Sequence, residues 1–209
     1  MRKLILTLLS AGVLCCVFSS CTIKYLPVAS SDISITDDFA VIKAKDITFA
    51  IENQYWIKEP QNLTDYFTTF YVSIKNNTDH YIDVDIDDII MLDEQDNQYN
   101  IVGIDYIETM LLPKQIEYLV INTIEESDDQ KLDAQQFLEN QKDALEKWRE
   151  AKTNLITYSL SFGTIYPGAK RSGFIFFPRL LSKNNKCKIL FRDKTIEFIR
   201  SDVKKKEEK

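Results

Sequence analysis

Acidic residues alternate along residues 83–88, which is the segment of this chain with the clearest potential for metal chemistry. The segment reads Asp-Val-Asp-Ile-Asp-Asp, and Asp93 and Glu94 follow a few residues later. Calcium binds through several carboxylate oxygens, and the loop of an EF-hand has Asp-x-Asp-x-Asp with Glu at position twelve. Residues 83–94 match those positions, so they are a candidate calcium loop.

Two features of the same segment oppose a calcium loop. Position six, which is Gly in the sharply turned EF-hand loop, is Asp88 here, and Val84 and Ile86 are apolar at the spacing of a β-strand. An acidic outer strand face is therefore the favoured interpretation. A looser metal site built from Asp87, Asp88 and Asp93 is the alternative.

Catalytic signatures are absent from the sequence. His80 is the only histidine and stands among turn-forming residues, which excludes histidine-rich metal sites and catalytic triads that need His. The chain has no Gly-rich phosphate loop, Cys-x-x-Cys or Gly-x-Ser-x-Gly. We expect no enzyme activity and no cofactor, and the remaining enzymatic alternative is a hydrolase that uses paired carboxylates.

Three aromatic residues are candidates for contact with a partner. If residues 70–75 and 82–86 pair as a hairpin, Tyr71 and Tyr81 project from its outer face beside charged residues, as on a recognition surface. The alternative is that cross-strand tyrosines only stabilise the sheet. Trp148 shares a helical face with Leu138 and Leu145, and this face either packs on the domain or binds a partner.

The first residues of the chain have the composition of an export signal. Two basic residues, Arg2 and Lys3, precede an apolar run over 4–18 that is too short to span a bilayer. Residues 18–21, Phe-Ser-Ser-Cys, resemble the lipobox of bacterial lipoproteins. The resemblance implies cleavage before Cys21, lipid on its thiol and an envelope location. Thr22 implies the outer membrane if the organism has one, because enterobacterial lipoproteins kept at the inner membrane have Asp there.

The charge balance restricts the partners. The chain has 32 acidic and 26 basic residues and a formal net charge of −6, and loss of residues 1–20 makes it more acidic. An acidic protein is not expected to bind nucleic acid or to adsorb to anionic lipid by itself. Cys187 is the one thiol left after lipidation of Cys21, and its apolar surroundings favour a buried small hydrophobe over a reactive thiol.

Turn residues and apolar periodicity divide the chain into a signal (1–20), a flexible tether (21–38), a β-rich domain (39–201) and a charged tail (202–209). An α-helix is expected at about 129–152. The strand at 70–75 should pair with 82–86 through the loop Asn77-Thr78-Asp79, with Ile74 opposite Ile82. Further strands are expected near 39–44, 47–51, 89–92, 98–104, 156–160, 173–177, 188–191 and 195–199.

Two motifs resemble a known family. Residues 70–79, Phe-Tyr-Val-Ser-Ile-Lys-Asn-Asn-Thr-Asp, and residues 167–176, Pro-Gly-Ala-Lys-Arg-Ser-Gly-Phe-Ile-Phe, are similar to segments of immunoglobulin-like extracellular domains of unknown function in bacterial lipoproteins. The resemblance covers about 66–104 and 156–199, which leaves the helix as an insertion. It implies an antiparallel immunoglobulin-like β-sandwich and no catalytic residue.

These observations favour a non-catalytic lipoprotein of the cell envelope that binds another envelope protein. A calcium- or small-ligand-binding domain is the first alternative, and a hydrolase is the second.

Overall fold

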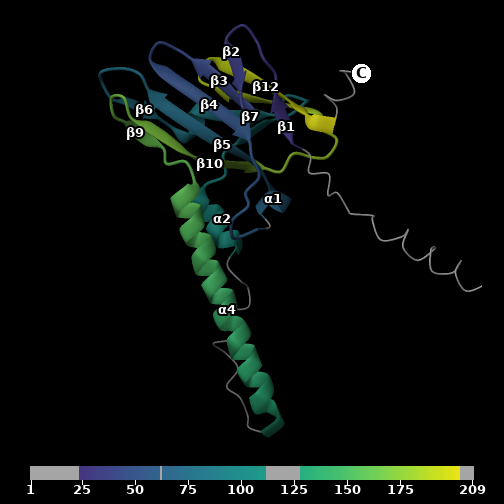
Figure 1. Cartoon of the computed structure of the whole chain (residues 1–209). Coiled ribbons are helices and arrows are strands. Elements are labelled where there is room, and N and C mark those ends of the chain that lie inside the picture. Colours follow the sequence, from purple (N-terminus) through teal and green to yellow (C-terminus); the bar gives the residue numbers. More distant parts are fainter. Residues whose placement is uncertain (1–23, 62, 112–127, 203–209) are drawn as a thin grey trace, which may run out of the picture.

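The computed structural model describes residues 24–61, 63–111 and 128–202. In the last range, the described side chains are that of Glu139 and those from Lys142 onward. Among these residues the fold is mainly β, with two five-stranded antiparallel sheets and a small two-stranded sheet (Figure 1). The first sheet has the order β1 (Tyr25–Pro27), β12 (Lys194–Arg200), β11 (Lys186–Phe191), β7 (Ile89–Leu92) and β8 (Gln98–Asn100). The second has the order β10 (Lys170–Pro178), β5 (Phe67–Asn76), β4 (Ile47–Asn53), β3 (Phe39–Lys43) and β2 (Ile33–Thr36). β6 (Ile82–Val84) pairs with β9 (Gly163–Ile165).

The two large sheets share one hydrophobic core. Their strands alternate buried and more exposed residues, because successive side chains of a strand point to opposite faces. Phe49 of β4 stacks on Phe191 of β11 with ring centroids 4.1 Å apart, and Phe70 of β5 meets Phe198 of β12 at 5.2 Å. The arrangement is therefore sandwich-like, and we call the two sheets together the sandwich.

A second hydrophobic core lies on the outer face of the second sheet. β10 is buried on both faces from Gly173 to Phe177. Ile175 and Phe177 belong to the sandwich core, whereas Phe174 and Phe176 belong to the second core. The second core is completed by Trp56, Leu63, Phe67, Ile107 and Leu155.

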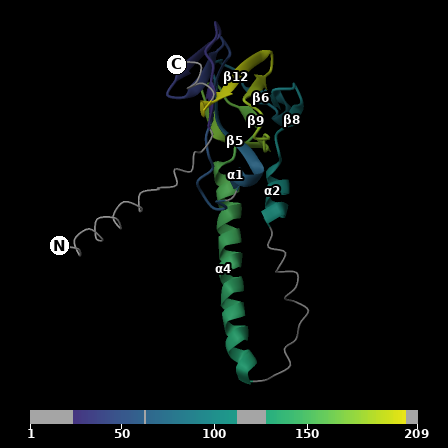
Figure 2. The same cartoon turned by 90° about the vertical axis from the view of Figure 1, so that its right-hand side faces the viewer.

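Helices cover this second core. α1 (Leu63–Tyr66) contributes Leu63, α2 (Ile104–Leu111) contributes Ile107, and the last turns of α4 (Asp128–Tyr158) contribute Leu155. Figure 2 shows α2 alongside the end of α4 nearest the sheets. The rest of α4 extends away from the sandwich (Figure 1). No helix among the described residues is both long enough and apolar enough to cross a membrane.

Several expected elements are confirmed. The helix exists, but it runs from Asp128 to Tyr158 and so exceeds the expected 129–152. The strand at 173–177 lies within β10, the last two strands pair as the hairpin β11–β12, and 89–92 pairs with β8 across the expected turn. Most of the charged tail lies outside the described residues.

The expected hairpin between 70–75 and 82–86 is wrong. β5 has β4 on one side and β10 on the other, so neither edge is open to β6. Val84 is buried, as the alternation predicted, but its strand pairs with β9. The alternation of apolar residues thus identified the buried face correctly. It carries no information on which strand lies next to β6, because that depends on the path of the chain between the sheets.

The expected strand at 156–160 is also wrong, because α4 continues to Tyr158. The flexible tether at 21–38 is wrong over most of its length. Tyr25 and Ile33 are buried, β1 pairs with β12, and β2 pairs with β3. These strands are only three and four residues long, and the polar residues between them masked their period.

Gly173 permits the junction between the helix and the sheet. A Cβ at this position would lie 2.4 Å from the Leu160 backbone nitrogen and 2.5 Å from the Ser159 carbonyl carbon. We expect Gly173→Ala to lower the free energy of unfolding by about 1–3 kcal/mol, the usual cost of overpacking. Urea denaturation at constant m-value measures the change.

The matched control is Ser172→Ala, an exposed position on the same strand. It should change the free energy of unfolding by no more than about 0.5 kcal/mol. Equal effects of the two substitutions would contradict the close approach at Gly173.

Candidate functional site

The C-terminal turns of α4 are fastened to the domain by burial and by a hydrogen bond. Ala151 and Leu155 are buried, and they lie four residues apart on one helical face. On the neighbouring side, Asn154 Nδ2 donates to the Glu59 carbonyl at 3.0 Å. This end of the helix is therefore part of the folded domain.

Charged side chains add to this attachment. Lys152 of α4 forms an ion pair with Glu108 of α2. Lys58 Nζ lies 3.9 Å from the centroid of the Tyr158 ring, within the range of a cation–π contact. Both contacts join α4 to segments that are distant in the sequence.

Trp148 lies where α4 leaves the domain. It precedes Ala151 by three residues and so continues the buried face, but it is only half-buried. Its indole Nε1 has no hydrogen-bond partner among the described residues, and Lys152 Nζ lies 5.6 Å from its ring centroid. Leu145, another three residues back, is also half-buried, while the side chain of Leu138 lies outside those described.

The two candidate tyrosines have different surroundings and are not on adjacent strands. Tyr71 of β5 is half-buried at the edge of the second core, with its ring centroid 5.2 Å from Phe174 and 6.4 Å from Phe39. Tyr71 therefore packs against residues of neighbouring strands, which fits the alternative that it stabilises the sheet. Tyr81 precedes β6 and is 64% exposed. The structure therefore does not bring Tyr71 and Tyr81 together on the outer face of a hairpin.

The acidic residues of 83–88 are engaged in local structure. Asp83 of β6 accepts a hydrogen bond from Thr164 Oγ1 of β9 at 2.6 Å. Asp85 caps the short 3-10 helix Ile86–Asp88, and its backbone nitrogen donates to Asp88 Oδ2 at 3.1 Å. The Asp88 carboxylate also faces Arg192 at 3.7 Å. Asp87 follows the cap in the first turn, so this segment is a capping box rather than an open loop.

Asp93 closes the turn between β7 and β8. Its carboxylate is buried and accepts hydrogen bonds from the side chain of Asn97, the backbone nitrogens of Gln95 and Asn97, and Tyr99 Oη, at 2.9–3.1 Å. These bonds, that of the Asn97 side chain first, hold the pKa of Asp93 below its usual value. Its oxygens are therefore used by the turn. In the described ranges no three His, Cys, Asp or Glu residues are grouped so as to hold a metal ion.

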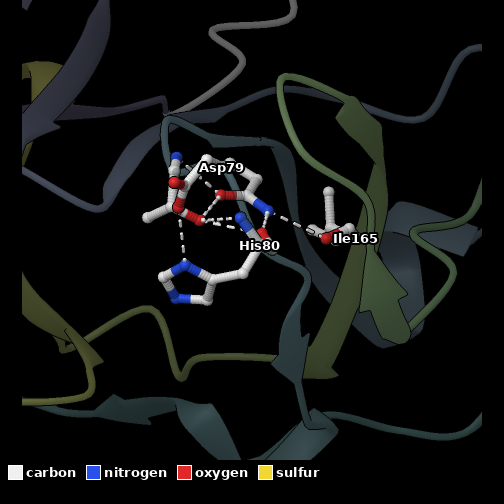
Figure 3. A network of polar contacts seen from close by, with 5 residues as sticks. Asp79, His80 and Ile165 are labelled. Carbon is white, nitrogen blue, oxygen red and sulfur yellow. Dashed lines mark hydrogen bonds and ion pairs between the residues drawn. The ribbon is translucent and has the colours of Figure 1, made fainter.

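His80 belongs to a turn organised by Asn76 (Figure 3). Asn76 is fully buried, and its Nδ2 donates to the carbonyls of His80 and Ile165 at 2.7 and 3.0 Å. Its Oδ1 accepts from Thr78 N and Thr78 Oγ1. The His80 ring contacts the exposed Asp79 at 3.1 Å and points to solvent. The network thus fixes the end of β5 next to β9, which is where the expected hairpin fails.

Cys187 is buried in the sandwich core, and burial raises the pKa of its thiol far above the usual value. The interpretation of Cys187 as a buried small hydrophobe is confirmed.

Leu155, which fastens α4 to the second core, was missed by sequence reasoning. It follows Trp148 and Ala151 on the same helical face, and the extension of this face beyond Lys152 was the signal that could have found it. Cys21 lies outside the described residues, and its lipidation stays a prediction.

No protein family, curated protein or solved structure matches this chain in the comparisons made.

Asn76 and Asn77 form a matched pair for testing the turn. We expect Asn76→Ala to lower the free energy of unfolding by about 2–3 kcal/mol, because it leaves buried carbonyls and an N–H without partners. Asn77 is exposed, and its Nδ2 bonds Thr48 Oγ1 at 2.9 Å, so Asn77→Ala should cost no more than about 0.5 kcal/mol. Thermal melting of both variants measures the loss of stability. A loss for Asn76→Ala no larger than that for Asn77→Ala would contradict the proposed network.

Proposed function

We propose that this chain is a non-catalytic lipoprotein of the cell envelope, held by lipid on Cys21, whose helix α4 binds another envelope protein. The domain that carries the helix is proposed to be of the immunoglobulin-like kind. The observation that carries the proposal is the position of α4, which is fixed at one end and extends outside the sandwich (Figure 1).

The dimensions of α4 suit a contact arm. Its 31 residues correspond to a length of about 46 Å at 1.5 Å per residue. Among the described side chains of α4, Ala151 and Leu155 are buried, and Leu155 belongs to the second core. The buried end of α4 fixes the direction of the helix relative to the sheets. The helix therefore projects from the domain without support from a partner.

The surface next to the point of exit has the composition of a binding face. Leu145 and Trp148 are half-buried apolar residues, and the exposed residues around them carry both signs of charge: Lys142, Asp143, Glu146 and Lys147. Helix-in-groove recognition uses apolar residues at this spacing, and tryptophan is enriched among residues that dominate binding energy. A polar rim of mixed charge favours a protein partner over a lipid surface.

The immunoglobulin-like assignment rests on the two sequence motifs and on their structural use. Gly168 of the Pro-Gly turn has a φ of +69°, which favours glycine, and Gly173 allows the approach of Leu160. The chain also passes from one large sheet to the other between β1 and β2 and between β10 and β11. The engagement of Asp88 and Asp93 in caps and turns leaves the calcium alternative without support, so we do not propose it.

Site-specific photo-crosslinking in intact cells tests the proposal. A photoreactive amino acid at Glu146, an exposed residue of α4, should capture one reproducible envelope protein, whereas the same group at Lys43, an exposed residue of β3, should not. Leu145→Ser should reduce capture at position 146 severalfold, because it removes apolar contact area from the binding face.

The melting temperature of Leu145→Ser serves as the control for folding. An unchanged melting temperature with reduced capture supports α4 as the binding element. Equal capture at both positions, or capture unaffected by Leu145→Ser, would contradict it.

A further inference from the structure

The domain begins very close to the residue that we propose carries the lipid. β1 starts at Tyr25, only four Cα–Cα steps after Cys21. At about 3.8 Å per step, Tyr25 lies at most about 15 Å from Cys21. A lipidated Cys21 stands at the bilayer surface, so the end of the domain that holds Tyr25 has to stay beside that surface.

Tyr25 is held in the domain by several hydrogen bonds. The distance between Cys21 and the domain therefore does not increase by detachment of β1. The Tyr25 backbone nitrogen donates to Asn53 Oδ1 at 2.8 Å, and its hydroxyl donates to the Asn184 carbonyl at 2.9 Å. Ser201 N donates to the Lys24 carbonyl at 2.7 Å. Burial also raises the pKa of the Tyr25 hydroxyl well above its usual range, consistent with an enclosed ring.

The loop after β10 lies next to Tyr25. Tyr25, Arg179, Leu181 and Ser182 line one cavity of about 330 Å³. Arg179 N donates to the Tyr66 carbonyl at 3.1 Å, which places Tyr66 beside the same loop. The segment 179–183 therefore shares one end of the sandwich with the start of β1.

The exposed side chains at this end suit the headgroup region of a bilayer. Leu181 is 60% exposed and Tyr66 is 52% exposed, and Arg179 and Lys183 are exposed cations. Tyrosine is enriched at membrane interfaces, and Lys and Arg are attracted to anionic headgroups. We define the surface of Tyr66, Arg179, Leu181 and Lys183 as the anchor-side surface.

We infer that the anchor-side surface lies against the headgroups of the bilayer that holds the Cys21 lipid. This inference rests on the proposed lipidation of Cys21. The acidic chain is not expected to adsorb by itself, but the anchor supplies a high effective concentration of bilayer at this surface. The domain is therefore seated on the membrane and not held away from it.

The opposite end of β10 provides a matched control. β10 has nine residues and spans about 30 Å at 3.3 Å per residue. Arg179 follows one end of this strand, and the turn at Tyr166 precedes the other. Tyr166 is 70% exposed, and Figure 1 shows β9, which ends just before it, on the far side of the sandwich from β1.

Lipid-borne quenching measures which end touches the bilayer. Mature protein that begins at the lipidated Cys21 is purified with its lipid and placed in phosphatidylethanolamine and phosphatidylglycerol vesicles that contain nitroxide-headgroup lipid. An environment-sensitive fluorophore is attached at Leu181→Cys, Lys183→Cys or Tyr166→Cys, while Cys187 is buried and does not react. We expect severalfold stronger quenching at positions 181 and 183 than at 166.

Mass spectrometry of Cys21 and vesicle flotation separate the possible failures. Lipidated, floating protein with equal quenching at all three positions would overturn the seating and leave the anchor intact. If the fluorophore at position 181 becomes less exposed to solvent as the protein concentration rises, but is not quenched by the lipid, the surface contacts a second copy of the chain. This outcome would also overturn the seating on the bilayer. An unmodified Cys21 with no flotation would overturn both the proposed anchor and this inference.

Discussion

Strand β10 is apolar on both faces from Gly173 to Phe177, and this requires cover on both sides of the second sheet. Ile175 and Phe177 point into the sandwich core, and Phe174 and Phe176 point to the outer face. Exposure of two phenylalanines would forfeit about 2–3 kcal/mol for each. The helices are thus needed by the sheet, and the sandwich and its helical part form one folding unit.

The second core explains why α4 can project. Trp56 meets Phe174 edge-to-face at 5.2 Å and Phe176 at 5.6 Å, and Leu155 closes the same cluster. Gly173 lets the chain that leaves α4 approach β10, where Leu160 N donates to the Phe174 carbonyl at 2.8 Å. The end of α4 is therefore attached to the strand that also contributes to the sandwich core.

The sequence predicted what depends on local pattern. β10, β7–β8 and β11–β12 followed from apolar runs and short polar turns, and the helix that carries Trp148 followed from its period. The pairing of β6 with β9 could not be predicted in this way, because it depends on the buried side chain of Asn76, which binds the carbonyls of His80 and Ile165 and holds the turn after β5. The end of α4 was missed because Ile156 to Leu160 also alternates like a strand. The burial of Leu155 in the second core favours the helix instead. Tyr25 and Ile33 were missed because their strands are shorter than a recognisable period.

Hydrogen exchange along α4 tests most directly whether the helix is clamped to β10. Amides of 151–158 should exchange about as slowly as those of β5 and β10, because opening them requires disruption of the second core. Amides N-terminal to Trp148 should exchange much faster, since that part of the helix lacks the same cover from the sheet. Uniformly fast exchange over the whole of α4, with β10 still protected, would contradict the shared core and with it the fixed projecting arm.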